Sequence, residues 1–117
     1  IKGVIAEGEA ANAEDVVSGL RDALKDEDTE GVILSINSPG GSPVQSGIIY
    51  DEIVRLRAKY PKKHVYAVIS DICASGGYYI ASAAEKIYAD KASIVGSIGV
   101  RMDGFGLEGT MKALGVE

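Results

Sequence analysis

Two segments of this chain share one layout, in which a short apolar run is followed by a pair of glycines and then by residues with helical spacing. They span residues 33–41 and 68–77 and contain the pairs Gly40-Gly41 and Gly76-Gly77. Glycine pairs between a strand and a helix permit tight turns and a close approach of the backbone. Strands that alternate with helices favour an α/β fold with parallel strands, which is the fold class we expect.

The spacing of apolar and turn-forming residues predicts the individual elements. Strands are expected at 4–6, 31–36, 65–69, 87–89 and 94–95, and helices after Asn12, after Ser42, at 75–81 and at 107–114. Asn12 and Ser42 are typical N-cap residues, and Gln45 has the spacing that completes a capping box with Ser42. The apolar, β-branched run 31–36 is typical of a strand that is covered on both faces. The buried stripe of the second helix is predicted at Ile49, Ile53, Leu56 and Tyr60.

Charge and composition exclude several classes of function. The net charge is −5, from 12 basic and 17 acidic residues, and this argues against a nucleic-acid partner, which requires clustered Lys and Arg. No apolar run approaches the ~18 residues that cross a bilayer. No His and Cys clusters suggest a metal, and no cofactor is expected. Cys73 is expected to pack as a small hydrophobic residue.

The glycine turns are candidates for a catalytic site. In an open α/β sheet, ligands and catalytic groups gather at the carboxyl ends of the strands. Backbone N–H groups in such turns can point at a developing negative charge. The two turns are therefore candidates for a shared oxyanion hole, with Ser75 as the nucleophile. Spacing alone also allows the simpler interpretation that both glycine pairs only make tight turns.

Three ordered motifs resemble those of the signal peptide peptidase A family, also called protease IV. They are Asn37-Ser38-Pro39-Gly40-Gly41-Ser42, Ala74-Ser75-Gly76-Gly77-Tyr78-Tyr79 and Gly96-Ser97-Ile98-Gly99-Val100. The resemblance extends over the whole chain. Family members are membrane-anchored bacterial serine peptidases that share the fold of the Clp protease proteolytic subunit and of crotonase. The resemblance thus implies a crotonase/Clp-protease-like fold and a serine endopeptidase activity.

The resemblance also implies a role for each motif. Ser75 would be the nucleophile, and the backbone amides of Gly41 and Gly76 would donate hydrogen bonds to the oxyanion. Gly40 and Gly77 would support the two turns. The substrate groove, where an extended peptide pairs as an added strand, would be lined by Ser97, Ile98 and Gly99.

A serine hydroxyl needs a base that takes its proton. The one imidazole, His64, is predicted at the far end of the strand that leads to Ser75, about 16 Å or more away, so we interpret it as a surface residue. The resemblance implies instead a Ser-Lys dyad, in which burial lowers the lysine pKa. In short family members that lysine lies beyond the position of Glu117. The nearest lysines in this chain, which do not match that position, are Lys86, Lys91 and Lys112.

Residues 1–117 are therefore expected to form a single partial peptidase domain that is inactive alone. The resemblance implies cleavage of signal-peptide remnants or other extended apolar peptides. It also implies a homo-oligomeric ring and a parent protein in the bacterial inner membrane, with its catalytic domain outside the cytoplasm. Three alternatives stay open: a non-catalytic peptide-binding or assembly module, a crotonase-type acyl-CoA enzyme, and a phage-capsid protease of the same superfamily.

Several other residues have structural explanations. Turn and cap chemistry accounts for three serines, Ser38, Ser42 and Ser46. Core packing accounts for Tyr78 and Tyr79, and Asp71 either orients the Ser75 turn or ends its strand. Residues 104–109 spell G-x-G-x-x-G, but no strong strand precedes them and the acidic residue ~20 positions on would fall past the chain end, so nucleotide binding is not expected.

Overall fold

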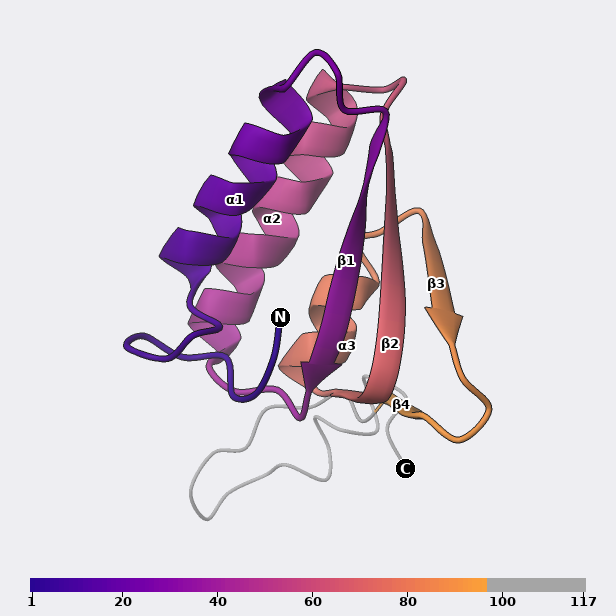
Figure 1. The fold of residues 1–117 in the computed structure, drawn as a ribbon. Coiled ribbons are helices and arrows are strands. Elements are labelled where there is room, and N and C mark those ends of the chain that lie inside the picture. Colours follow the sequence, from indigo (N-terminus) through magenta and orange to yellow (C-terminus); the bar gives the residue numbers. More distant parts are fainter. Residues whose placement is uncertain (97–117) are drawn as a thin grey trace.

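Within residues 1–96, four parallel strands form one sheet, shown in Figure 1. The computed structural model describes residues 1–96. In chain order the elements are α1 (Ala13–Lys25), β1 (Gly31–Ser38), α2 (Pro43–Lys59), β2 (His64–Ala74), α3 (Gly76–Ala81), β3 (Lys86–Ala89) and β4 (Ile94–Gly96). β2 pairs with β1 along one edge and with β3 and then β4 along the other. The predicted fold class, parallel strands alternating with helices, is confirmed.

The N-terminal segment is not the strand that the sequence predicts at 4–6. Ile5 makes only isolated bridges, one to Ala11 and one to Gly41. Gly3 and Gly8, on either side of it, have φ of 79° and 83°, which interrupt an extended run. Ile5 is nonetheless completely buried, so this segment contributes one core side chain rather than a strand.

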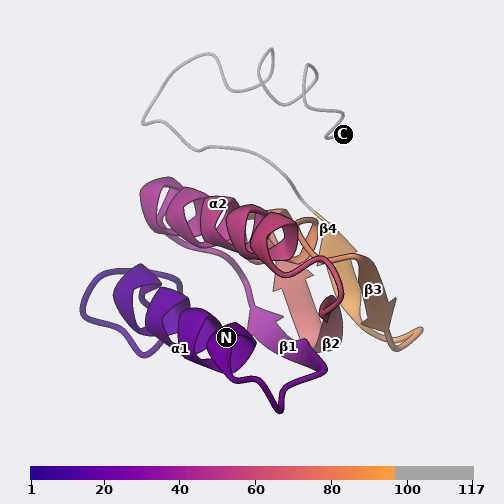
Figure 2. The same cartoon turned by 90° about the horizontal axis from the view of Figure 1, so that it is seen from above.

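The two long helices lie side by side on one face of the sheet, as Figure 2 shows. Leu34 and Ile36 of β1 are buried, whereas Ile33 on the opposite face is 67% exposed. The expectation that both faces of β1 are covered is therefore wrong for the described residues. The predicted helix at 107–114 lies outside them.

Both predicted N-caps are present, but the predicted capping box of Ser42 and Gln45 is not formed. Asn12 Oδ1 accepts a hydrogen bond from Asp15 N at 2.9 Å, and Ser42 Oγ accepts one from Gln45 N at 3.1 Å. The Gln45 side chain does not return to Ser42. Its Oε1 accepts from Ala13 N at 2.7 Å, so it joins the start of α1 to the start of α2.

The core lies between the helices and the sheet. Its fully buried large side chains include Ile5, Leu24, Ile36, Ile49, Ile53, Leu56, Val65 and Ile80. Cys73 is also fully buried, and burial raises the pKa of its thiol to about 11. The prediction that Cys73 packs as a small hydrophobic residue is confirmed. Among residues 1–96, no helix has the length and apolar character to span a bilayer.

A carboxylate between the helices fixes α1 against α2. Glu52 is 8% exposed and accepts hydrogen bonds from Arg21 of α1, at 3.0 and 3.2 Å, and from Arg55 of α2. These bonds, those from Arg55 first, lower the pKa of Glu52 from 4.5 to about 2. Glu52 is thus charged in the folded state over the whole neutral and mildly acidic range.

We expect Glu52→Gln to lower the free energy of unfolding at pH 7 by about 1–2 kcal/mol, because the charged hydrogen bonds are weakened while both guanidinium groups remain half exposed. The folded pKa lies below the unfolded one, so this stabilisation is present above pH 4.5 and is lost as the pH falls towards 2. Urea unfolding of both proteins between pH 7 and pH 2.5 should show the difference shrinking.

Asp51→Asn is the matched control, since Asp51 is the exposed neighbour of Glu52 on the same helix. Its effect should stay within about 0.5 kcal/mol. A stability difference between the unchanged protein and Glu52→Gln that is constant over this pH range would contradict the ion-pair explanation.

Candidate active site

The predicted site lies where β1 and β2 end at the same edge of the sheet (Figure 1). Ser38, the last residue of β1, pairs with Cys73 near the end of β2. The turn 39–41 and the turn at Ser75 therefore start from adjacent points. The register brings together the two glycine turns that the sequence predicts as one site.

Gly40 packs directly against the second turn. A Cβ at Gly40 would lie 2.8 Å from Ser75 Cβ and 2.9 Å from Gly76 N. Real Cβ atoms do not approach other atoms so closely, and the φ of 107° at Gly40 is itself unfavourable for a side chain. Glycine at residue 40 thus permits the contact between the two turns. Gly77 similarly packs against Ser38 O, 3.1 Å from the position of an added Cβ.

Ser75 has a strained backbone. Its φ of 50° and ψ of −120° make it the one non-glycine residue of positive φ in the described part of the chain. Such conformations cost about 1–3 kcal/mol and gather at functional sites. Ser75 precedes α3, but its side chain makes no capping hydrogen bond. A sharp, strained turn between a strand and a helix that exposes a serine hydroxyl is also the arrangement of the nucleophile elbow in α/β-hydrolases.

Two backbone amides of the glycine turns have no hydrogen-bond acceptor within the described residues. Within residues 1–96, neither Gly41 N nor Gly76 N donates a hydrogen bond. The Ser75 amide, in contrast, donates to Gly96 O at 2.9 Å. The first turn is held by Ile5, which donates to Gly40 O at 2.9 Å and accepts from Ser42 N at 2.6 Å. In the part of the chain that the structure describes, the two N–H groups that the resemblance implies as oxyanion donors therefore have no hydrogen-bond partner.

Two polar side chains that the sequence analysis did not place in the site hold its turns. Ser38 is completely buried, donates to Gly3 O at 2.6 Å and accepts from Gly40 N at 3.1 Å. Asn37 Oδ1 accepts from Ile72 N at 3.3 Å, where the register with β2 is interrupted. The role of Ser38 could be predicted, because a serine two residues before a glycine is a recognisable turn signal. The role of Asn37 could not, because its partner is 35 residues away.

Ser46 differs from its predicted role. It is neither a cap nor a turn residue, since it lies inside α2 with its side chain 1% exposed. Tyr79 is also not a core residue: it is 40% exposed and stacks on Tyr50 of α2, with ring centroids 4.4 Å apart. Tyr78 does pack against the core. Asp71 is an exposed residue within β2, which continues to Ala74, so Asp71 does not end the strand.

The described residues bring no base to Ser75. His64 begins β2, at the opposite end from Ser75, and its exposed ring lies 2.7 Å from Glu85, which agrees with the surface interpretation. Lys86 begins β3, which runs parallel to β2, and is therefore also at the opposite end. Lys91 is exposed in the turn after β3. Among residues 1–96, Ser75 Oγ makes no hydrogen bond to a basic side chain.

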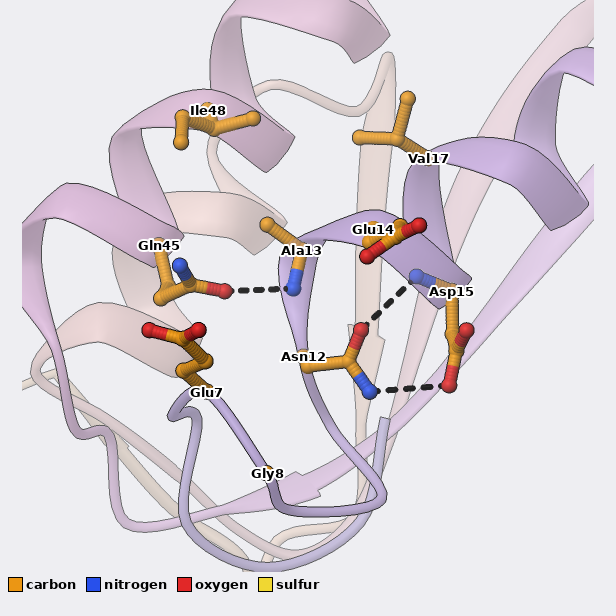
Figure 3. Close-up of a pocket in the computed structure, with 9 residues that line it drawn as sticks. All are labelled: Glu7, Gly8, Asn12, Ala13, Glu14, Asp15, Val17, Gln45 and Ile48. Atoms are coloured by element: carbon orange, nitrogen blue, oxygen red, sulfur yellow. Dashed lines mark hydrogen bonds between the residues drawn. The ribbon is translucent and has the colours of Figure 1, made fainter.

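A pocket of about 590 Å³ lies beside the first turns of α1 and α2, as Figure 3 shows. Glu7, Glu14 and Asp15 give it an acidic rim, and Gln45 crosses it to reach Ala13 N. No predicted catalytic residue lines it. No group of three His, Cys, Asp or Glu residues suited to a metal ion occurs in the part of the chain that the structure describes.

Several predictions lie outside the described residues. They concern Ser97, Ile98 and Gly99 of the substrate groove, Lys112, and the glycine-rich residues 104–109. The groove assignment stays a prediction.

A family model, described as Peptidase family S49, matches residues 57–117. This is just over half of the chain, and it includes Ser75 and both glycines that follow it.

Individual proteins agree with this match. Protease 4 of Haemophilus influenzae is 38% identical over 120 residues, 99% of this chain and 19% of that protein. A protein of Brucella melitensis named Na(+)/H(+) antiporter NhaA is 50% identical over 98 residues, 84% of this chain and 13% of that protein. The chain thus spans less than a fifth of the length of either relative. The antiporter's name refers to the whole protein, and only 13% of that protein is similar to this chain.

A solved structure, the ClpP1 N165D mutant from Listeria monocytogenes, aligns with a TM-score of 0.58 and 32% sequence identity. The alignment covers 73% of this chain and 44% of that one. The Clp-protease-like fold that the motifs imply is therefore confirmed.

We expect Ser38→Ala to lower the free energy of unfolding by about 1–3 kcal/mol, because the buried Gly40 N and the part-buried Gly3 O lose their hydrogen-bond partner. Ser35→Ala is the matched control, since Ser35 lies on the same strand with an exposed side chain. Urea unfolding of both variants measures the difference. Equal effects at the two positions would show that Ser38 does not hold the turn.

Proposed function

Because this chain belongs to peptidase family S49, which confirms the family inferred from its motifs, we propose that it carries the nucleophile and the oxyanion hole of a serine endopeptidase. The observation that carries the proposal is the strained, uncapped Ser75 next to two unpartnered amides. Ser75 is half-buried and Gly41 is exposed, so a substrate carbonyl can reach both groups.

The proposed reaction is acyl transfer. Ser75 Oγ bonds to the peptide carbonyl carbon while its proton passes to a base. The amides of Gly41 and Gly76 stabilise the negative oxygen of the tetrahedral intermediate, and each donor would supply roughly 2.7–4 kcal/mol of transition-state stabilisation. The base then protonates the leaving amine as the carbon–nitrogen bond breaks. Water hydrolyses the remaining ester and frees Ser75.

The proposed base is a lysine outside residues 1–117. A lysine acts as a base only when its pKa is lowered by burial. Lys86 and Lys91 have exposed side chains. The exposure of these two lysines supports a base elsewhere, in a Ser-Lys dyad.

The wider assignment follows the family resemblance and is also a proposal. Signal-peptide remnants and other extended apolar peptides are the proposed substrates. We place the parent protein in a bacterial inner membrane, with the catalytic domain outside the cytoplasm. The likeness to a Clp protease structure supports a homo-oligomeric ring.

In the protein as its gene encodes it, a fluorophosphonate probe should label Ser75, because this reagent reacts with a serine that has both a base and an oxyanion hole. Mass spectrometry of the labelled peptide identifies the residue. Ser75→Ala should abolish labelling and reduce peptide hydrolysis by roughly 10⁴-fold or more.

Ser70→Ala is the control for this test, since Ser70 is an exposed serine of β2, the strand that precedes Ser75. The Ser70→Ala variant should be labelled to the same extent as the unchanged protein. Failure of Ser75 to react would favour a non-catalytic peptide-binding module of the same fold.

Residues 1–117 alone should show no peptide or peptide-ester hydrolysis that depends on Ser75, because the base is missing. A comparison of this chain with the gene-encoded protein, at equal concentration and with the same ester, measures the difference. Turnover by the 117-residue chain that disappears in Ser75→Ala would place the base within it.

A further inference from the structure

One buried hydroxyl has no hydrogen-bond partner in the described part of the chain. Ser46 is 1% exposed, and its Oγ is buried and unpaired among residues 1–96. Its backbone is ordinary helix, with Ser46 N donating to Ser42 O at 3.0 Å. The unusual feature of Ser46 is therefore its hydroxyl. Folding removes this hydroxyl from water, and no group within residues 1–96 replaces the hydrogen bond that water would make.

The hydroxyl lies at the candidate active site. Ser46 Oγ occupies the space that a Cβ at Gly76 would need, so the two would overlap. The position that this added Cβ would take is 3.3 Å from Ser46 Cβ and 3.6 Å from Gly41 N. Ser46 Oγ and Gly41 N therefore both lie beside the same side of Gly76.

Packing alone does not explain a serine at this position. Alanine has a higher helix propensity and would fill the same place on α2 without burying an unpaired hydroxyl. Buried polar groups without a partner are rare, and a catalytic role or a bound water or ion is among the explanations for one. The three unpartnered groups, two N–H and one O–H, are all hydrogen-bond donors, and they gather beside the residue that would attack a carbonyl.

We propose that Ser46 is a third hydrogen-bond donor of the oxyanion pocket, acting on the same anionic oxygen as the Gly41 and Gly76 amides. The inference rests on the proposed function, because it names a further donor for that intermediate. It differs from a purely steric role, in which Ser46 would only fill the space left by the missing Cβ of Gly76.

The first test is the kinetics of Ser46→Ala in the gene-encoded protein, with an apolar peptide ester as substrate. We expect kcat to fall about 10- to 100-fold, at or below the effect of removing a full oxyanion donor. KM should stay within about twofold, because the hydrogen bond forms only when the oxygen is charged. The melting temperature should be unchanged or higher, because an unpaired hydroxyl has been removed.

Gly47→Ala is the matched control on the same turn of α2, where an added Cβ meets nothing within 4 Å. It should keep the kcat of the unchanged protein. A kcat for Ser46→Ala within about twofold of the unchanged protein would overturn the inference and leave the peptidase proposal intact.

The second test needs no turnover. In the Ser75→Ala background, calorimetric titration compares the peptide acetyl-Leu-Ala-Ala as a free carboxylate and as its C-terminal carboxamide. The carboxylate should bind more tightly, and adding Ser46→Ala should reduce that preference about tenfold, the effect of losing one hydrogen bond to a charged group.

If the gene-encoded protein with Ser75 intact hydrolyses no peptide or ester, a carboxylate preference that depends on Ser46 would support the third donor and contradict the peptidase proposal. A preference that is the same with and without the Ser46→Ala substitution, or no carboxylate binding at all, would overturn the inference.

Discussion

The contact between Gly40 and the Ser75–Gly76 peptide is the constraint on which the site depends. A side chain at residue 40 would meet Ser75 Cβ at 2.8 Å and Gly76 N at 2.9 Å, so even a methyl group would push the two turns apart. In the proposed site, the amides of Gly41 and Gly76 could then no longer face one oxygen atom. The proposed oxyanion hole therefore requires a residue without a side chain at position 40, and the positive φ of Gly40 adds to the need for glycine.

The rest of the fold holds this contact in place. Parallel pairing brings the ends of β1 and β2 to one edge, and the buried Ser38 hydroxyl and the bridging residue Ile5 fix the first turn. Glu52 joins α2, which carries Ser46, to α1. A strained residue such as Ser75 persists only where the surrounding structure holds its turn, and these interactions surround that turn.

Local chemistry explains how much could be predicted from the sequence. Turn residues and N-caps act over a few positions, so the strand–glycine–helix layout, the caps Asn12 and Ser42, and the family were all recognisable. Long-range partners were not: the Gln45 side chain bonds Ala13, which is 32 residues away. The exposed face of β1 was missed because a continuous apolar run gives no alternation to identify it. The burial of Ser46 could have been predicted, because this polar residue has helical spacing from the buried Ile49 and Ile53.

A crystal structure of the gene-encoded protein after reaction with a fluorophosphonate tests the central claim most directly. We expect phosphorus bonded to Ser75 Oγ and a phosphoryl oxygen about 3 Å from both Gly41 N and Gly76 N, which is the usual length of such hydrogen bonds. An adduct on another residue, or a phosphoryl oxygen that points to solvent with both amides unpartnered, would contradict it.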